Sequence, residues 1–268
     1  MADLPIPIGR SEQAADLAVR EERPHLGLVF ERFPRVLERD GSGFAMSSAR
    51  HEWLTRFIEL SARSNPLLSR YHQRLDAACA AMGGERHVLE TRGRLAIGLG
   101  NPNAAEIGFA LDHATGLPVI PGSSLKGLAR AGARLLDEEA AAFEVLGSPS
   151  SPDAREAGRS GTVILLDALP ETWPPPGGGF EIDVVTRHHD PGKLAEQKTP
   201  LDTDEPSPVH FLVVTAGVRF VIRLLPRRPG SSGDVATAWR WLERAGSLLG
   251  AGGKTAVGYG EMRPTDLK

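Results

Sequence analysis

The fold of this chain is decided by a stretch that reads Gly116-Leu-Pro-Val-Ile-Pro-Gly-Ser-Ser-Leu-Lys-Gly-Leu-Ala-Arg130. Its two prolines disfavour helix on their N-terminal sides, so the first part is predicted to be extended. Ser123 or Ser124 is then expected to cap a helix that continues to about residue 146. A helix N-terminus that also offers hydroxyls and the Lys126 ammonium is typical of an anion site, above all for phosphate. The alternative is an ordinary turn that enters a solvated helix.

Basic residues continue along this predicted helix. Lys126, Arg130 and Arg134 are spaced four apart and so lie on one helix face. No acidic residue occurs between Asp112 and Asp137. Nothing close in sequence neutralises the basic stripe, which favours contact with phosphate.

Composition narrows the classes of function. The chain has 268 residues, 41% of them hydrophobic, and a net charge of −3 at pH 7. That charge argues against a wholly basic nucleic-acid binder, so any contact with RNA must come from a local patch. The single cysteine, Cys79, excludes an internal disulfide and fits a reducing compartment. The sequence begins without a signal-like segment and has no long apolar run, so we expect a cytoplasmic protein.

Residues 1–87 are interpreted as a tail followed by a helical extension. The segment 25–34 is apolar and is expected to dock on the rest of the chain. One helix is expected with Trp53, Phe57 and Leu60 on one side, and a second over residues 66–82. These helices carry no recognisable chemistry.

From residue 88 the pattern changes to strands. Strands are predicted over 88–99 and 180–186, and the continuous apolar run 161–169 is predicted to be a central strand. Residues 209–215 and 218–225 flank Ala216-Gly217, which predicts a hairpin.

The second strand of that hairpin has a basic side. Arg219, Val221 and Arg223 alternate with apolar residues, so one face is basic and suits nucleic acid or, equally, plain solvent. A last helix is expected to be capped by Asp234. Its inward side chains are expected to be Val235, Trp239, Leu242 and Leu249. The segment 173–179, Trp-Pro-Pro-Pro-Gly-Gly-Gly, is interpreted as a surface excursion.

The order of elements predicts the fold class. From residue 88 it is strand, helix, strand, extended insertion, strand pair, helix, strand. This order predicts an α+β domain over 88–268 with an antiparallel sheet of the ferredoxin-like or RRM-like βαββαβ type, which commonly serves RNA. Residues 187–208 form a long loop insertion whose composition is not expected to order itself without a partner.

A second candidate phosphate-binding element is the turn Gly250-Ala-Gly-Gly-Lys-Thr-Ala-Val-Gly-Tyr-Gly260. Its Gly253-Lys254-Thr255 resembles the end of a P-loop, but position 248 is leucine and the turn follows a helix rather than a strand. We therefore reject ATP binding. What remains is a glycine-lined backbone with a lysine and a hydroxyl that can approach a phosphate chain.

The insertion offers two weaker candidates. His188-His189-Asp190 could bind a metal, but adjacent histidines diverge in an extended chain and no third ligand is spaced for zinc. His188 or His189 could serve as an acid–base residue for RNA cleavage, although no lysine or tyrosine partner is evident nearby. We expect no catalytic residue, no metal and no other cofactor.

Both glycine-containing motifs resemble those of the RAMP superfamily of CRISPR effector proteins. Pro121–Gly127 is similar to its helix-opening motif and Gly250–Gly260 to its C-terminal glycine-rich loop. Within the type III-B, or Cmr, effectors the chain resembles the family of the sixth subunit. The segments that carry this resemblance are His25–Phe33, Glu106–Phe109, Asp183–His189 and Pro206–Phe211. Arg187 departs from that family's pattern, in which proline is expected.

The resemblance implies a non-catalytic subunit that binds crRNA near its 3′ side and takes part in antiviral defence. It would stack on the backbone RAMP subunit and contact the other end-capping RAMP subunit, close to target RNA and without a membrane. The family's RNA-binding positions, carried over to this sequence, are joined by Arg130 and Gly253 from the same two motifs. The expected RNA-binding residues are therefore Ser123, Ser124, Lys126, Arg130, Arg187, His188, Gly253, Lys254 and Thr255. Two other classes stay open: a repeat-RNA endonuclease that uses His188 or His189, and an assembly module that contacts protein alone.

Overall fold

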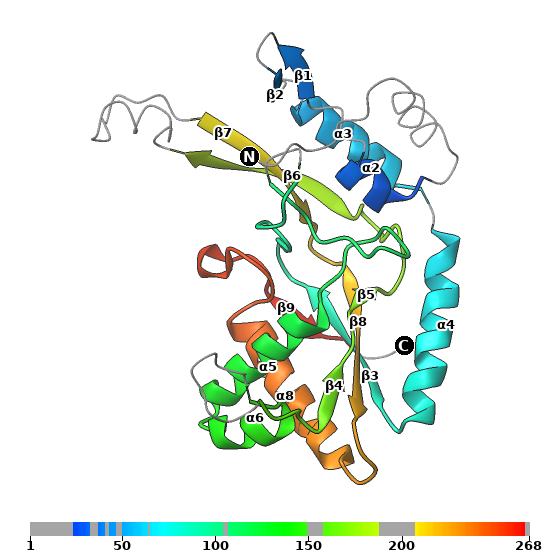
Figure 1. Cartoon of the computed structure of the whole chain (residues 1–268), viewed down its shortest axis with the longest axis vertical. Coiled ribbons are helices and arrows are strands. Elements are labelled where there is room, and N and C mark those ends of the chain that lie inside the picture. The colour runs from blue at the N-terminus through cyan, green and yellow to red at the C-terminus, as the bar shows by residue number, and fades with distance from the viewer. Residues whose placement is uncertain are drawn as a thin grey trace, which may run out of the picture.

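The structure is a computed structural model that describes residues 24–32, 37–40, 43–46, 50–63, 65–103, 107–148, 158–187 and 207–265. Among the described N-terminal residues are helices and a small hairpin (Figure 1). These elements are α2 Leu26–Arg32, β1 Leu37–Asp40, β2 Gly43–Met46, α3 Arg50–Ser61 and α4 Pro66–Ala81. The expected docking of 25–34 is confirmed over its described residues, because Leu26, Val29 and Phe30 are buried. The two expected helices are α3 and α4.

An antiparallel sheet forms the centre of the molecule. Its strands are β3 Glu85–Thr91, β4 Val163–Leu165, β8 Arg219–Pro226 and β9 Met262–Pro264, in the order β4-β8-β3-β9, and β5 Leu169–Pro170 also pairs with β8. The helices α5 Gly122–Leu135, α6 Glu139–Val145 and α8 Ser232–Leu248 lie on one side of the sheet, and α4 lies on the other (Figure 1). The α+β class with an antiparallel sheet is confirmed.

A separate two-stranded ribbon extends away from this sheet (Figure 1). It consists of β6 Phe180–Arg187 and β7 Ser207–Val214, which pair antiparallel along their whole length. Its base packs under α3, where the rings of Phe57 and Phe180 lie 5.5 Å apart. Trp173 joins this aromatic cluster 5.0 Å from Phe180, and its indole N–H donates to the Ser61 carbonyl (2.8 Å). The interpretation of 173–179 as a surface excursion is therefore wrong for Trp173, which is buried.

The predicted hairpin at Ala216-Gly217 is wrong. The turn exists, but β7 pairs with β6 while β8 pairs with β3, β4 and β5. The turn is held by the end of β3, because the Thr91 carbonyl accepts a hydrogen bond from Gly217 N (2.7 Å). The chain thus passes from the ribbon into the central sheet at this point.

Two strand predictions need correction. The strand predicted over 88–99 is β3, which begins at Glu85 and ends at Thr91; after a bend at Arg92-Gly93, Leu95 and Ala96 bridge to Val214 and Gly253. The run 161–169 is not central, since β4 is an edge strand and the chain leaves the sheet between β4 and β5. It leaves because Ala168 exchanges two backbone hydrogen bonds with Ile120 (both 2.9 Å).

The helix predicted over 123–146 is two helices. The helix is interrupted at Asp137, whose φ of 56° lies in the left-handed region. Asp234 does not cap α8, because Ser231 precedes the helix and Asp234 accepts from the Thr162 hydroxyl (2.6 Å). The inward face of α8 is centred on Trp241, which is fully buried, whereas Leu249 is 39% exposed. No helix in the described ranges is both long and apolar enough to cross a membrane.

Candidate RNA-binding site

The N-terminus of α5 is already bonded to a carboxylate. Gly122 N donates to Asp167 Oδ1 (2.7 Å), and a Cβ on Gly122 would lie 2.3 Å from the Leu165 carbonyl oxygen. Ser123 and Ser124 are exposed and do not cap the helix, so that prediction is wrong. A carboxylate complements the helix dipole. A phosphate approaching the helix axis would therefore meet a negative charge.

The predicted basic stripe divides into two parts. Arg134 pairs with Glu139 (2.8 Å), because α6 folds back along α5, so the expectation of an unneutralised stripe is wrong at this position. Arg130 instead donates Nη2 to the Gly147 carbonyl (2.5 Å), and its guanidinium lies 5.6 Å from the Phe143 ring centroid. Burial, followed by nearby positive charge, lowers the pKa of Lys126. Neither Lys126 nor Arg130 is paired with a carboxylate in the described part of the chain.

The glycine-rich loop 250–260 is held against the segment that follows β3. Gly253 N donates to the Ala96 carbonyl and Gly260 N to the Arg94 carbonyl, both at 2.7 Å. A Cβ on Gly252 would lie 2.2 Å from the Ala96 carbonyl oxygen, so this close approach requires glycine. The predicted residues Gly253, Lys254 and Thr255 thus lie together at the beginning of a tightly held loop.

Lys254 is directed onto two aromatic rings. Its backbone is left-handed, with φ 58°. Its Nζ lies 5.4 Å from the ring centroid of Phe211 on β7 and 5.7 Å from that of Tyr259 in the same loop. Cation–π attraction at such distances holds the ammonium in place without neutralising it. The Lys254 ammonium therefore lies where the glycine-rich loop meets the ribbon.

Polar contacts join the loop to the ribbon beside Lys254. The Tyr259 hydroxyl donates to Asp183 on β6, and Arg94 pairs with Asp183 (3.1 Å) and with Glu181. Although burial opposes it, the hydrogen bond from Tyr259 and the charge of Arg94 hold the pKa of Asp183 below its usual range. We call Arg94, Asp183, Glu181 and Tyr259 the loop–ribbon clamp.

The basic sheet face predicted for nucleic acid is covered by α4. Arg223 is 1% exposed, and it donates to Asp76 Oδ1 (2.7 Å) and to His72 Nδ1 (2.8 Å), both on α4. Burial lowers the pKa of His72, whose Nε2 lies 2.7 Å from the Pro170 carbonyl oxygen. Arg219 pairs with Glu171 (3.2 Å). This face is an internal ion-pair network, so its interpretation as an RNA surface is wrong.

The remaining candidates lie at the end of the ribbon. Arg187 is the last residue of β6, opposite Ser207, and His188 and His189 lie outside the described residues. In the described part of the chain, no three His, Cys, Asp or Glu side chains gather as metal ligands.

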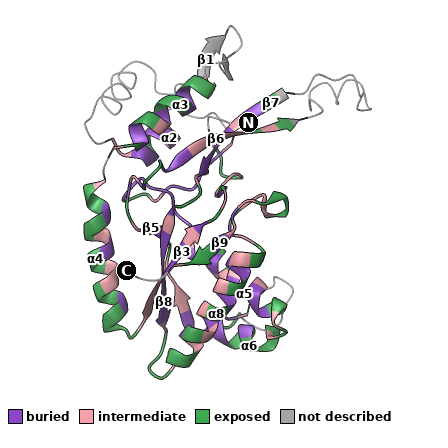
Figure 2. Ribbon diagram, turned by 180° about the vertical axis from the view of Figure 1, so that it is seen from behind, coloured by how far each residue is buried: buried purple, intermediate pink, exposed green. Residues whose placement is uncertain are grey.

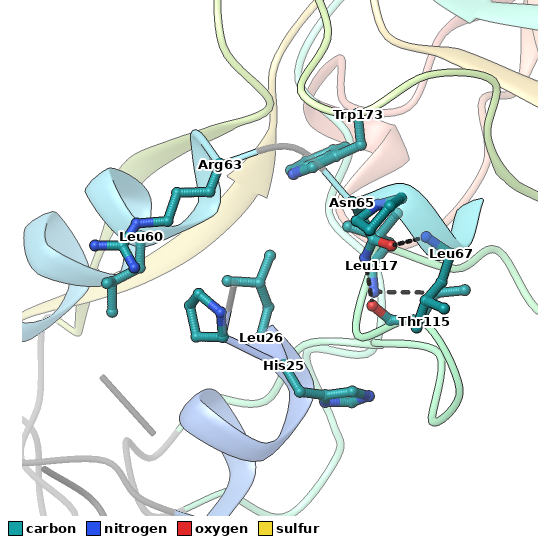
Figure 3. Close-up of a pocket in the computed structure, with 11 residues that line it drawn as sticks. His25, Leu26, Leu60, Arg63, Asn65, Leu67, Thr115, Leu117 and Trp173 are labelled. Atoms are coloured by element: carbon teal, nitrogen blue, oxygen red, sulfur yellow. Dashed lines mark hydrogen bonds between the residues drawn. The ribbon is translucent and has the colours of Figure 1, made fainter. Parts of the chain in front are cut away.

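A pocket between α2, α3 and α4 is lined by none of the predicted RNA-binding residues (Figure 3). Leu26, Leu60 and Trp173 contribute its apolar wall. Asn65 lines it, donating to the Thr115 carbonyl (2.7 Å) and accepting from Leu67 N (3.1 Å). Its polar groups thus hold α4 onto the body of the protein.

Sequence reasoning missed most of the surroundings of Lys254. Phe211 and Asp183 lie on the ribbon and Arg94 on the segment after β3, far from the loop in sequence. Tyr259 alone carried a signal, because it stands inside the glycine-rich motif. An aromatic residue among glycines beside a lysine is a usable clue to a cation–π contact.

Known proteins resemble this chain in sequence and structure. Residues 88–263 match the RAMP superfamily. The CRISPR system Cmr subunit Cmr6 of Pyrococcus furiosus is 23% identical over 76% of this chain and 75% of its own length. A chain of a type III-B Cmr-beta complex bound to cognate target RNA, solved by cryo-EM, superposes with a TM-score of 0.63. It is 20% identical over 82% of this chain and 72% of that one.

The crystal structure of Cmr6 from Pyrococcus furiosus gives a TM-score of 0.42 at 22% identity, over 68% of this chain and 98% of that one. The superfamily match spans both glycine-containing motifs and includes all or part of each strand of the central sheet. The chain belongs to the RAMP superfamily.

Proposed function

We propose that this chain is a crRNA-binding subunit of a type III-B CRISPR complex, equivalent to Cmr6. Membership of the RAMP superfamily and the similarity to Cmr6 support this assignment. The Cmr-beta complex, whose chain shares this architecture, was solved with target RNA bound. The antiviral role, the cytoplasmic location and the contact with target RNA are part of the same proposal.

The observation that carries RNA binding is the setting of Lys254. A left-handed backbone and two aromatic rings fix its ammonium, and the exposed Gly252 and Gly258 on either side leave the main chain open to a ligand. Such a site suits phosphate groups and is indifferent to base sequence. Gly253 already donates its N–H to Ala96, so it would let the main chain approach the phosphate closely, while Thr255 would contribute a hydroxyl. The exposed Ser123 and Ser124 would donate their hydroxyls from the first turn of α5.

We propose a ferredoxin-like core for residues 88–268, with residues 1–87 as an extension. The sheet order β4-β8-β3-β9, with α5 before β4 and α8 before β9, supports the βαββαβ assignment. β3 begins at Glu85, three residues before the proposed boundary.

We assign the chain no catalytic role. It would cap the backbone filament near the 3′ side of the guide, next to the backbone RAMP subunit and the other end-capping subunit. Arg187 and His188 would begin the insertion directed at the guide–target duplex. Incubating repeat RNA with the protein without metal tests the endonuclease alternative, since cleavage that is lost in His188→Ala or His189→Ala would establish it.

Charge reversal at Lys254 tests the proposal directly. Lys254→Glu should weaken binding of a crRNA-length single strand and lower the slope of log affinity against log salt by about 0.7, the value for one lost phosphate contact. Arg70→Glu on the exposed side of α4 is the matched control and should keep the wild-type slope. Fluorescence anisotropy over a range of salt concentrations measures both. Equal slopes in the two variants would favour the assembly module that contacts protein alone.

A further inference from the structure

Two backbone segments touch beside α5 and orient a pair of arginines. Gly147 and Ser160 form a β-bridge, and a Cβ on Gly147 or on Gly161 would lie 2.6 Å from the backbone nitrogen of the other. Gly147 also has φ 83°, which suits glycine. The backbones at Gly147 and Gly161 are therefore in close contact.

The backbone carbonyls of Gly147 and Gly161 each accept a hydrogen bond from one arginine. Arg130 on α5 donates Nη2 to Gly147 O (2.5 Å), and Arg227, directly after β8, donates Nε to Gly161 O (2.9 Å). Because these two backbone segments are in contact, the two guanidinium groups are held on neighbouring residues although they come from positions 97 residues apart. Arg130 Nη1 is buried and has no hydrogen-bond partner among the described residues.

Lys126 completes the cluster one helical turn before Arg130. Its pKa is lowered by burial and then by the positive charges of Arg130 and Arg227, so both guanidinium groups are close enough to repel the Lys126 ammonium. Within the described ranges no carboxylate pairs with any of the three. Asp234, on the neighbouring α8, accepts instead from the Thr162 hydroxyl (2.6 Å).

We propose that Lys126, Arg130 and Arg227 form a phosphate site, the three-cation site, that binds a phosphodiester group of bound RNA. The inference rests on the proposed function and adds Arg227, which no sequence motif indicated. Repelling cations on a partly desolvated surface favour an anion, and guanidinium groups suit phosphate because they donate in pairs. The site lies on the side of α5, away from the helix end that Asp167 already occupies.

Charge reversal of Arg227 in the full-length protein tests this site. Arg227→Glu should weaken binding of a crRNA-length single strand by about tenfold, or ~1.4 kcal/mol, and lower the salt slope by about 0.7. Arg228→Glu makes the same charge change at the next, exposed residue and should have a much smaller effect. Arg227→Gln keeps a donor for Gly161 O without introducing repulsion, and it should still lower the slope. Thermal melting verifies that each variant is folded.

The possible outcomes distinguish a failure of this site from a failure of the proposed function. If both Arg227 variants keep the slope of Arg228→Glu while Lys254→Glu loses affinity, the three-cation site is wrong and RNA binding stands. If Lys254→Glu also has no effect, both proposals fail. Inorganic phosphate that raises the melting temperature of wild type but not of Arg227→Gln, with RNA affinity unchanged in that variant, would show a site for free phosphate only and overturn the RNA assignment.

Discussion

At the scale of single residues, burial decides what an arginine does here. Arg223 is 1% exposed and bonded to Asp76 and His72, whereas Arg219 on the same face keeps about a third of its side chain exposed and pairs with Glu171. A buried charge that loses its partner carries a large desolvation cost, while an exposed ion pair contributes little. Two arginines four positions apart on one strand therefore contribute very differently to stability.

Replacing the two arginines should separate these cases. We expect Arg223→Met to lower the free energy of unfolding by about 2 to 3 kcal/mol, less than a fully buried pair because Asp76 is partly exposed and also lies near Arg86. Arg219→Met should cost less than about 1 kcal/mol. Urea unfolding measures both, and neither change should alter RNA affinity. If a folded Arg223→Met protein lost RNA binding, this prediction would be wrong and the sheet face would be an RNA surface after all.

At the scale of elements, the contact between α5 and α8 depends on one glycine. A Cβ on Gly132 would lie 2.0 Å from the Trp241 carbonyl oxygen, so the two helix backbones meet at this point. Gly127, in the same helix, has no atom within 4 Å of the position of its Cβ. The two glycines share a helix and differ only in their surroundings.

Alanine at these two glycines should have opposite effects. We expect Gly132→Ala to destabilise the protein by about 2 kcal/mol or more, because backbone atoms cannot yield as a flexible side chain can. Gly127→Ala should stabilise it by about 0.5 to 1 kcal/mol, since alanine favours helix. Thermal unfolding of the two variants measures the contrast. A stable Gly132→Ala protein would mean that α5 and α8 can separate at little cost.

Elements with complete local signals could be predicted from the sequence. Asn65 caps α4, Pro66 occupies its first turn and Gly83 follows its end, so its bounds were predicted to within one residue. The two glycine-containing motifs located α5 and the 250–260 loop for the same reason. Local chemistry determined these features.

Features that depend on distant partners could not be predicted. The cap of α5 comes from Asp167, 45 residues later, and Arg223 finds Asp76 147 residues earlier. The turn at Gly217 carries a normal hairpin signal, yet Thr91 and the ribbon direct its two flanking strands into different sheets. In each case a tertiary contact overrides a local preference. Such contacts cannot be read from the local pattern of a single sequence.

At the scale of the whole molecule, the coverage of the sheet restricts where RNA can bind. The helix α4 covers one face and α5 with α8 the other; between them β8 is largely buried, and β3 has no exposed residue (Figure 2). The loop–ribbon clamp and the three-cation site both lie on the side away from α4. RNA is therefore expected to follow the edge formed by α5, the glycine-rich loop and the ribbon.

Site-specific photocrosslinking tests this path. Val257, at the tip of the glycine-rich loop, is 69% exposed, and Leu67 on α4 is 52% exposed, so the same photoreactive amino acid should be accepted at either position without disturbing the core. We expect crosslinks to single-stranded RNA from position 257 and few or none from position 67. The two variants differ in which side of the sheet they sample, which makes each the control of the other. Strong crosslinking from position 67 with none from 257 would move the RNA to the α4 side and contradict the assignment of both phosphate sites.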